Sequence, residues 1–162
     1  MATEQPTKAQ WAAVERHLVM PGSSAKLLVD GFELTLQVHR AKGLRNTIVV
    51  FINGVLEWRI SSEDCEERRR FWRLRERRLY PKSEADATQK KHGKRFRQQL
   101  GMDKTLTLYS PDWPSFTPLR RHLAKNNTHI QLVVREYDNY WLEGVDLSGA
   151  IHEATAEEVA NG

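Results

Sequence analysis

The sequence predicts an α+β fold, in which a mostly antiparallel sheet of two β-hairpins plus later strands packs with two or three helices. Two turn dipeptides, Asp30-Gly31 and Asn53-Gly54, each separate two runs rich in β-branched and aromatic residues. Both dipeptides tolerate the positive φ angles of a tight type I′ turn. We therefore expect two consecutive hairpins that form one four-stranded antiparallel meander over residues 26–60.

The second predicted strand alternates apolar and polar side chains. Such alternation places one set on a buried face and the other on a face that meets water or a partner. We therefore expect helices to cover only one face of the sheet. The buried set is Phe32, Leu34, Leu36 and Val38.

Helical spacing predicts a short amphipathic helix over residues 7–18. Trp11, Val14 and Leu18 recur at intervals that place them on one side of a helix. Thr7 is a suitable N-cap, and Pro21-Gly22 favours an end to the helix soon after it.

A second helix is expected from about Ser62 to at least Arg70, because Ser62 is a suitable cap and acidic residues follow it where the helix dipole favours them. The sequence leaves open whether residues 71–80 continue this helix, because arginines interrupt its apolar face. Residues 81–97 are polar and rich in lysine, which predicts a mobile loop or a weak helix.

Two later strands are predicted at residues 105–110 and 128–138, with a helix between them at 118–125. Pro118 occupies the first position of that helix, where its missing N–H costs nothing. The strand-helix-strand order allows the two strands to pair in parallel through a right-handed crossover.

Length and charge favour a single α+β domain over residues 1–142, followed by an acidic tail over 143–162 that we expect to be disordered. No Lys or Arg follows Arg135, whereas seven Asp and Glu residues do. The formal net charge of +4 therefore hides a charge of +11 on the residues up to Arg135.

Cysteine content and hydropathy indicate where the chain works. A single cysteine, Cys65, cannot form an internal disulfide, and no stretch has the order of a secretory signal. The longest apolar runs are far shorter than the roughly 20 residues needed to span a bilayer. We therefore expect a cytoplasmic protein with no membrane partner.

Seven arginines lie within residues 68–78, around Phe71 and Trp72. Guanidinium groups pair bidentately with phosphate, and aromatic rings stack on bases, which favours a nucleic-acid surface. Arg and Trp also dominate protein interfaces, so an acidic protein partner is the second interpretation. The third is a solvated helix face whose glutamates neutralise the arginines.

Further basic residues extend this surface, and one tryptophan joins it. Trp113 lies in a proline-rich turn that we expect to be exposed, so it is the tryptophan expected to contact a partner, whereas the others are expected to pack in the core. The candidate binding residues are Arg68, Arg69, Arg70, Arg73, Arg75, Arg77, Arg78, Lys90, Lys91, Lys94, Arg95, Arg97, Arg120, Arg121 and Trp113.

No pattern in the sequence indicates a catalytic residue, a metal site or a cofactor. The histidines lack metal-ligand spacing, and the phosphate-loop, dinucleotide and nucleophile-elbow motifs are missing. Glu33 is followed by Leu34 and Thr35, so the acid-x-lysine arrangement of metal-dependent nucleases is missing as well. We expect a protein that works by binding and is not an enzyme.

Four segments, taken in order, resemble small uncharacterised accessory proteins that bacteriophages and integrated elements of Gram-negative bacteria carry. The segments are FELTLQVHR, VVFINGVLEWR, CEERRRFWR and SFTPLRRHLAKNNTHIQLV. The resemblance implies a mobile-element accessory protein in the cytoplasm of a bacterial host. No functional residue is carried over with it.

Two hypotheses for function follow. The first is an accessory protein that binds nucleic acid through its Arg/Lys-rich surface. The alternative is a stoichiometric inhibitor or adaptor of a host protein complex, in an anti-CRISPR-like or other anti-defence role. In either case the acidic tail is a candidate to cover the arginines until a partner displaces it.

Overall fold

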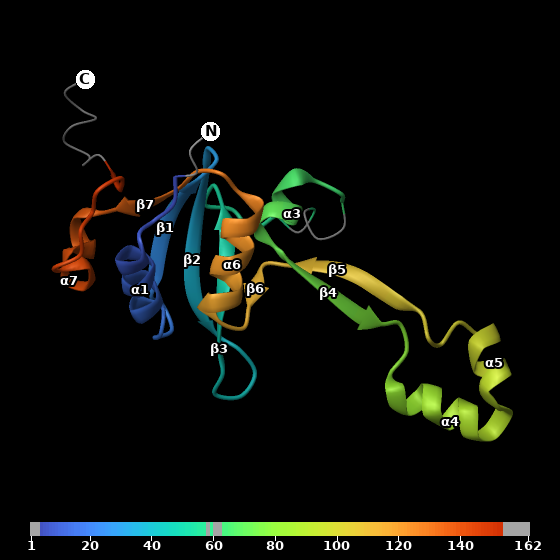
Figure 1. The fold of residues 1–162 in the computed structure, drawn as a ribbon. Coiled ribbons are helices and arrows are strands. Elements are labelled where there is room, and N and C mark those ends of the chain that lie inside the picture. The colour runs from blue at the N-terminus through green and yellow to red at the C-terminus, as the bar shows by residue number, and fades with distance from the viewer. Residues whose placement is uncertain (1–3, 58, 60–62, 154–162) are drawn as a thin grey trace.

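The computed structural model describes residues 4–57, 59 and 63–153. They form a body built on a six-stranded sheet and an arm that projects from it (Figure 1). The arm is a two-stranded ribbon that carries two short helices at its far end. Helices combined with a mostly antiparallel sheet confirm the predicted α+β class.

The sheet of the body has the strand order β6-β3-β2-β1-β7-β8, and only β7 and β8 run parallel. The predicted first hairpin is present, since Asp30 and Gly31 have φ angles of 46° and 89° and connect two antiparallel strands. The strands are β1 (Ser24–Val29), β2 (Phe32–Arg40), β3 (Asn46–Ile52), β6 (Asp112–Trp113), β7 (Ile130–Val134) and β8 (Ile151–His152).

The predicted second hairpin is wrong. The turn at Asn53-Gly54 forms, but among the described residues it leads only to an isolated bridge between Ile52 and Val55. The edge of β3 that a fourth meander strand would need is occupied by the chain returning from the arm, where the Val50 N–H donates to the Pro111 carbonyl at 3.0 Å. The meander therefore has three strands, and β6 completes its edge.

Helices α1 (Lys8–His17) and α6 (Phe116–Asn126) cover one face of the sheet (Figure 1). The predicted N-terminal helix is confirmed, with the Gln10 N–H donating to the Thr7 hydroxyl in a capping box. The later predicted helix begins two residues before Pro118. Of the residues predicted to be buried, Leu34, Leu36 and Val38 lie in the core, and Phe32 is partly buried against it.

The arginine-rich segment is half helix and half strand. Helix α3 (Glu66–Phe71) ends at Trp72, whose backbone is extended at φ −102° and ψ 149°, and β4 (Arg73–Arg78) follows at once. Phe71 and Trp72 are both fully buried, which anchors the chain in the core at the point where it leaves the body. This answers the question that the sequence left open for residues 71–80.

The arm consists of β4, α4 (Lys82–His92), α5 (Lys94–Gln99) and β5 (Thr105–Ser110). Residues 81–97 are mostly helical, although Ala85 is the one buried residue that the two helices supply. The parallel pairing expected between residues 105–110 and the last strand is wrong, because β5 pairs antiparallel with β4. A buried parallel strand needs apolar side chains on both faces, whereas β5 alternates with threonine and stays largely exposed.

The C-terminal part of the described chain belongs to the body. The strand predicted over 128–138 ends at Val134, and η1 (Glu136–Asp138) and α7 (Asn139–Leu142) follow. The acidic tail expected from residue 143 is packed as far as Glu153. The Gln10 side chain donates to the carbonyls of Asp146 and Ser148 at 2.8 and 3.1 Å, and β8 pairs with β7. The rest of the predicted tail, 154–162, lies outside the described residues.

Hydropathy along the described helices is low. None of them combines the length and the apolar character that crossing a bilayer requires.

The anchor at the base of the arm yields a stability prediction. Trp72→Ala removes a fully buried side chain and should lower the free energy of unfolding by about 3–5 kcal/mol. Leu79→Ala, at a position that is half exposed on the arm, should change it by less than about 0.5 kcal/mol. Chemical denaturation measures both, and equal losses in the two variants would contradict the assigned anchor.

Candidate functional site

The structure divides the predicted arginine cluster at the root of the arm. The three arginines of α3 pair with carboxylates of the body, of their own helix, or of Asp64 just before it. The Arg68 Nη2 and Arg69 Nε atoms lie 3.3 and 3.0 Å from Asp64 Oδ1, and Arg70 pairs with Asp30 at 3.1 Å and with Glu66 at 2.8 Å. These arginines are therefore largely neutralised.

Asp30 holds the position of Arg70. Its carboxylate accepts hydrogen bonds from the backbone N–H groups of Thr128 and His129, the latter at 2.7 Å. Partial burial alone would raise the pKa of Asp30, but these N–H donors and the charge of Arg70 outweigh it, so that the pKa is lowered. A turn residue of the first hairpin thus anchors the arginine-rich helix to the sheet.

The first residues of β4 are also held by the body. Arg73 and Arg75 lie 3.2 and 3.6 Å from the two carboxylate oxygens of Asp112 in β6. The guanidinium carbon of Arg68 lies 4.3 Å from the ring centre of Tyr109 in β5, a cation–π contact. Both strands of the ribbon are therefore fastened at the root.

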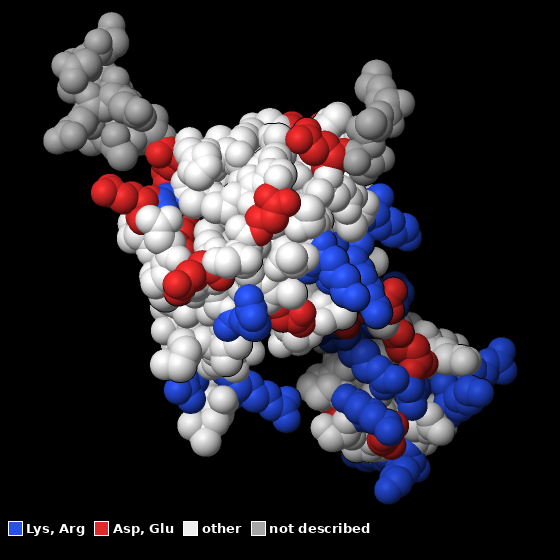
Figure 2. Space-filling model, turned by 60° about the vertical axis from the view of Figure 1, so that its left-hand side comes forward, with Lys and Arg blue, Asp and Glu red and all other residues white. Residues whose placement is uncertain are grey.

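Beyond the root, six predicted residues lie on the arm with exposed side chains and no ion pair to a carboxylate in the described part of the chain. They come from the end of β4, the end of α4 and the start of α5, and they are Arg77, Arg78, Lys90, Lys91, Lys94 and Arg95. Blue side chains gather over the arm in Figure 2.

The charge of the arm differs in sign from that of the remaining chain. Residues 73–110 hold 11 Lys and Arg against four Asp and Glu, a formal charge of +7, which leaves −3 for all other residues. Two of the 11, Lys82 and Lys104, were missed by sequence reasoning. Lys104 belongs to the arm because of pairing across the ribbon, where the Leu79 N–H donates to the Lys104 carbonyl at 3.0 Å. No local sequence signal could have identified this residue.

Arg97, predicted to bind a partner, has a structural position. Its guanidinium contacts Asp86 at 3.4 Å and Gln89 at 2.7 Å, both on α4, and also pairs with Asp103 after α5. The side chain is mostly buried among these groups. Because Ala85 is the one buried residue of α4 and α5, this ion-pair cluster is what holds the tip of the arm together.

The expectation that Trp113 contacts a partner is wrong, because this residue is only 3% exposed. Trp113 pairs with Ile48 of β3, so both side chains enter the same covered face of the sheet. Its indole N–H donates to the Phe71 carbonyl at 3.3 Å, which connects the two ends of the arm. The half-buried ring of His122 lies 5.0 Å from it.

The two predicted arginines of α6 lie on the body, outside the arm. Arg120 is half-buried and Arg121 is exposed, and α6 packs beside α3. They are separated in the chain and in the fold from the ribbon, so the structure does not bring them together with the outer residues of the arm (Figure 1).

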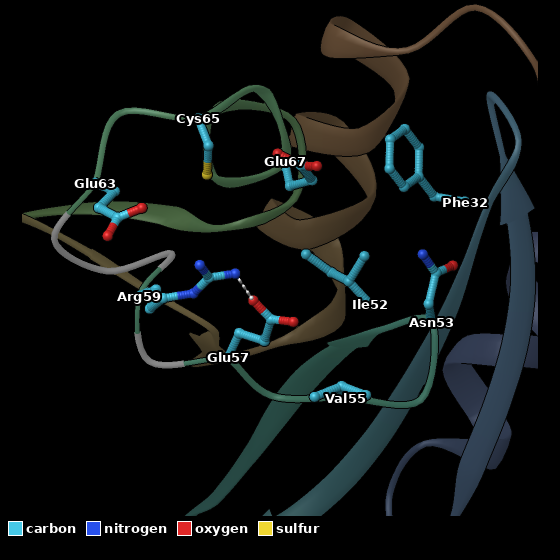
Figure 3. A pocket seen from close by; sticks show the side chains of 9 residues that line it. All are labelled: Phe32, Ile52, Asn53, Val55, Glu57, Arg59, Glu63, Cys65 and Glu67. Carbon is cyan, nitrogen blue, oxygen red and sulfur yellow. Dashed lines mark hydrogen bonds and ion pairs between the residues drawn. The ribbon is translucent and has the colours of Figure 1, made fainter.

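A hollow of about 290 Å³ lies between the Asn53-Gly54 turn and the segment before α3 (Figure 3). Arg59 pairs with Glu57 at 2.9 Å in its wall. Its lining residues are Phe32, Ile52, Asn53, Val55, Glu57, Arg59, Glu63, Cys65 and Glu67. Three glutamates make this hollow unsuitable for a polyanion. Cys65 is half-exposed here.

Within 4–57, 59 and 63–153, no three His, Cys, Asp or Glu side chains gather as a metal ion would need. No protein-family model, curated protein or solved structure shows a significant match to the chain.

The ion pairs of Arg97 predict a local effect on the arm. Arg97→Gln removes the charge that joins α4 to the end of α5, so the backbone amides of both helices should exchange with solvent faster. Amides in the body should keep their rates. Hydrogen–deuterium exchange measures both, with Arg95→Gln as the exposed neighbour expected to have no effect. Faster exchange throughout the body would contradict a role confined to the tip.

Burial of His122 predicts how stability depends on pH. Burial lowers the pKa of His122 below its ordinary 6.5, so the unfolded chain binds the proton more readily than the folded one. The stabilisation is present above pH 6.5 and is lost as the pH falls below it.

His122→Gln should therefore reduce the rise in free energy of unfolding between about pH 5 and pH 7, measured by denaturation at each pH. Part of the pH dependence of stability should remain in this variant, because burial also lowers the pKa of His17. An unchanged slope in His122→Gln would contradict the effect of burial.

Proposed function

We propose that this chain binds nucleic acid through its arm. The observation that carries the proposal is the formal charge of +7 on residues 73–110, with the outer basic side chains unpaired by any described carboxylate. The root arginines serve a different purpose, because carboxylates of the body already hold them.

A cation binds phosphate favourably when the interaction energy with phosphate exceeds the energy lost by breaking its existing ion pairs. Arg77 and Arg78 are exposed and have no ion pair to break in the described structure, so a phosphate adds interaction energy without displacing a carboxylate. A concentrated positive field also raises the rate of encounter with a polyanion at low salt. The release of condensed counterions from the nucleic acid supplies much of the affinity.

The resemblance to accessory proteins of bacteriophages and integrated elements gives this binding a setting. A chain of this kind acts in the cytoplasm of a bacterial host, on the nucleic acid of the element or of the host. The positive charge of the arm fits this proposed location, because nucleic acid is an abundant polyanion in the bacterial cytoplasm.

A second candidate function rests on a separate observation. The arm exposes five large apolar side chains by 39–54%, namely Leu74, Leu79, Phe96, Leu100 and Leu106. Exposed apolar groups among arginines favour a protein partner with an acidic rim. The chain would then be a stoichiometric inhibitor or adaptor of a host protein complex.

The salt dependence of binding tests the main proposal. Wild-type protein should bind duplex DNA with an affinity that falls linearly in a plot of log K against log salt between about 50 and 200 mM. The double variant Arg77→Gln/Arg78→Gln should bind more weakly and lose about two units of slope, because each lost phosphate contact removes roughly one unit. Fluorescence anisotropy of labelled DNA measures both quantities.

The matched control is Lys8→Gln/Lys125→Gln, which removes the same charge from exposed positions on α1 and α6. It should retain the wild-type slope. Absence of binding to DNA and RNA at low salt would overturn the proposal and leave the protein partner as the better candidate. Equal slope losses in the two double variants would show that net charge alone, and not the arm, carries the binding.

A further inference from the structure

A second basic projection lies at the end of the β2–β3 hairpin. We define the hairpin loop as residues 40–45, which include Arg40, Lys42 and Arg45 as exposed cations. None of the three has an ion pair to a carboxylate in the described part of the chain. Leu44 between them is 90% exposed.

The base of this loop is fixed to the body. The Ala41 N–H donates to the Arg45 carbonyl at 2.8 Å and closes the loop. The Asn46 side-chain amide donates to the Val19 carbonyl at 2.8 Å and connects the loop to the segment that follows α1. The three cations are therefore presented from a defined place, at the end of the sheet where β2 meets β3.

The hairpin loop and the tip of the arm extend toward the same end of the molecule. Figure 1 shows the loop between β2 and β3 below the sheet, at the height reached by α4 of the arm. In Figure 2, turned about the vertical axis, blue side chains at the lower end of the body and on the arm lie on two sides of an open space. The hairpin loop and the arm are therefore two separate projections with exposed cations at the same end of the molecule.

We propose that one DNA duplex contacts both projections, with the ribbon of the arm at a groove and the hairpin loop on the sugar-phosphate backbone. This inference rests on the proposed function and extends it to a second contact site and to a class of nucleic acid. A short DNA duplex is stiff, so its contact with the arm fixes the path it takes past the hairpin loop, whereas a flexible single strand has no such fixed path.

The dimensions of the ribbon suit the major groove of B-form DNA. Each strand has six residues and is about 20 Å long, and a two-stranded ribbon fits the groove, which is about 12 Å wide. Leu106 and Leu108 of β5 point to one face of the ribbon, and apolar groups of this kind contact thymine methyl groups in the major groove. The major groove of A-form RNA is too deep and narrow for such a ribbon.

The hairpin loop is tested by Lys42→Gln/Arg45→Gln, measured beside Arg77→Gln/Arg78→Gln and the control Lys8→Gln/Lys125→Gln. The probe is a blunt duplex of roughly 30 bp, about three helical turns. We expect the loop variant to lose between about one and two units of salt slope relative to wild type. On a single strand of the same sequence, the loop variant should match the control.

A proximity measurement complements the slopes. Leu44→Cys in a Cys65→Ser background, labelled with a photoactivatable group, should crosslink to the duplex, whereas Lys125→Cys in the same background should not. Circular dichroism confirms that each variant is folded.

The inference is overturned if the loop variant keeps the slope of the control and position 44 gives no crosslink, while the arm variant still loses slope. It is equally overturned if the loop variant loses as much slope on the single strand as on the duplex. Failure of the proposed function is a different result, in which the wild-type protein binds no nucleic acid and the arm variant changes nothing.

Discussion

The closure of the arm at its root is the constraint on which the rest of the structure depends. The chain leaves the body through Phe71 and Trp72, both fully buried, and returns through Trp113, whose indole N–H donates to the Phe71 carbonyl. An isolated two-stranded ribbon is at best marginally stable in water, so its ends must be held by a larger core. These three aromatic residues belong to the core of the body and supply that support. Without them, the ribbon would have no fixed direction from the sheet.

The closed root of the arm separates one run of arginines into two groups with different functions. Close to the root, Asp30 and Asp112 hold Arg70 and Arg73, so these cations contribute to the attachment of α3 and β4. Farther out, no described carboxylate reaches Arg77 or its neighbours, and the positive charge remains available to a ligand. Partly exposed pairs of this kind contribute little energy individually, but several of them acting on one short segment restrict its orientation. The charge of the arm and the direction of the arm are thus set by different residues of the same segment.

Local patterns predicted the elements whose information lies in neighbouring residues. The capped first helix, the Asp30-Gly31 hairpin and the alternating burial of β2 all follow from spacing and turn chemistry, and the structure has them. The second hairpin failed because Asn53-Gly54 specifies a turn without specifying which strand occupies the edge of β3, and the segment from the arm occupies it. Trp113 was misplaced for the same reason. Its flanking prolines indicated an exposed turn, whereas its pairing with Ile48 placed it in the core.

By itself, the sequence determined the α+β class, the positions of α1, α6 and the strands β1, β2, β3, β5 and β7, and a concentration of positive charge between residues 66 and 97. Only the tertiary structure decided which of those charges are free. Ion pairing depends on distances between groups far apart in the chain, such as Arg70 and Asp30 or Arg73 and Asp112, and each pair is 39 or 40 residues apart. Composition counts both partners but contains no information about their separation in space. Folding therefore converts one basic segment into an attached root and an exposed, positively charged arm.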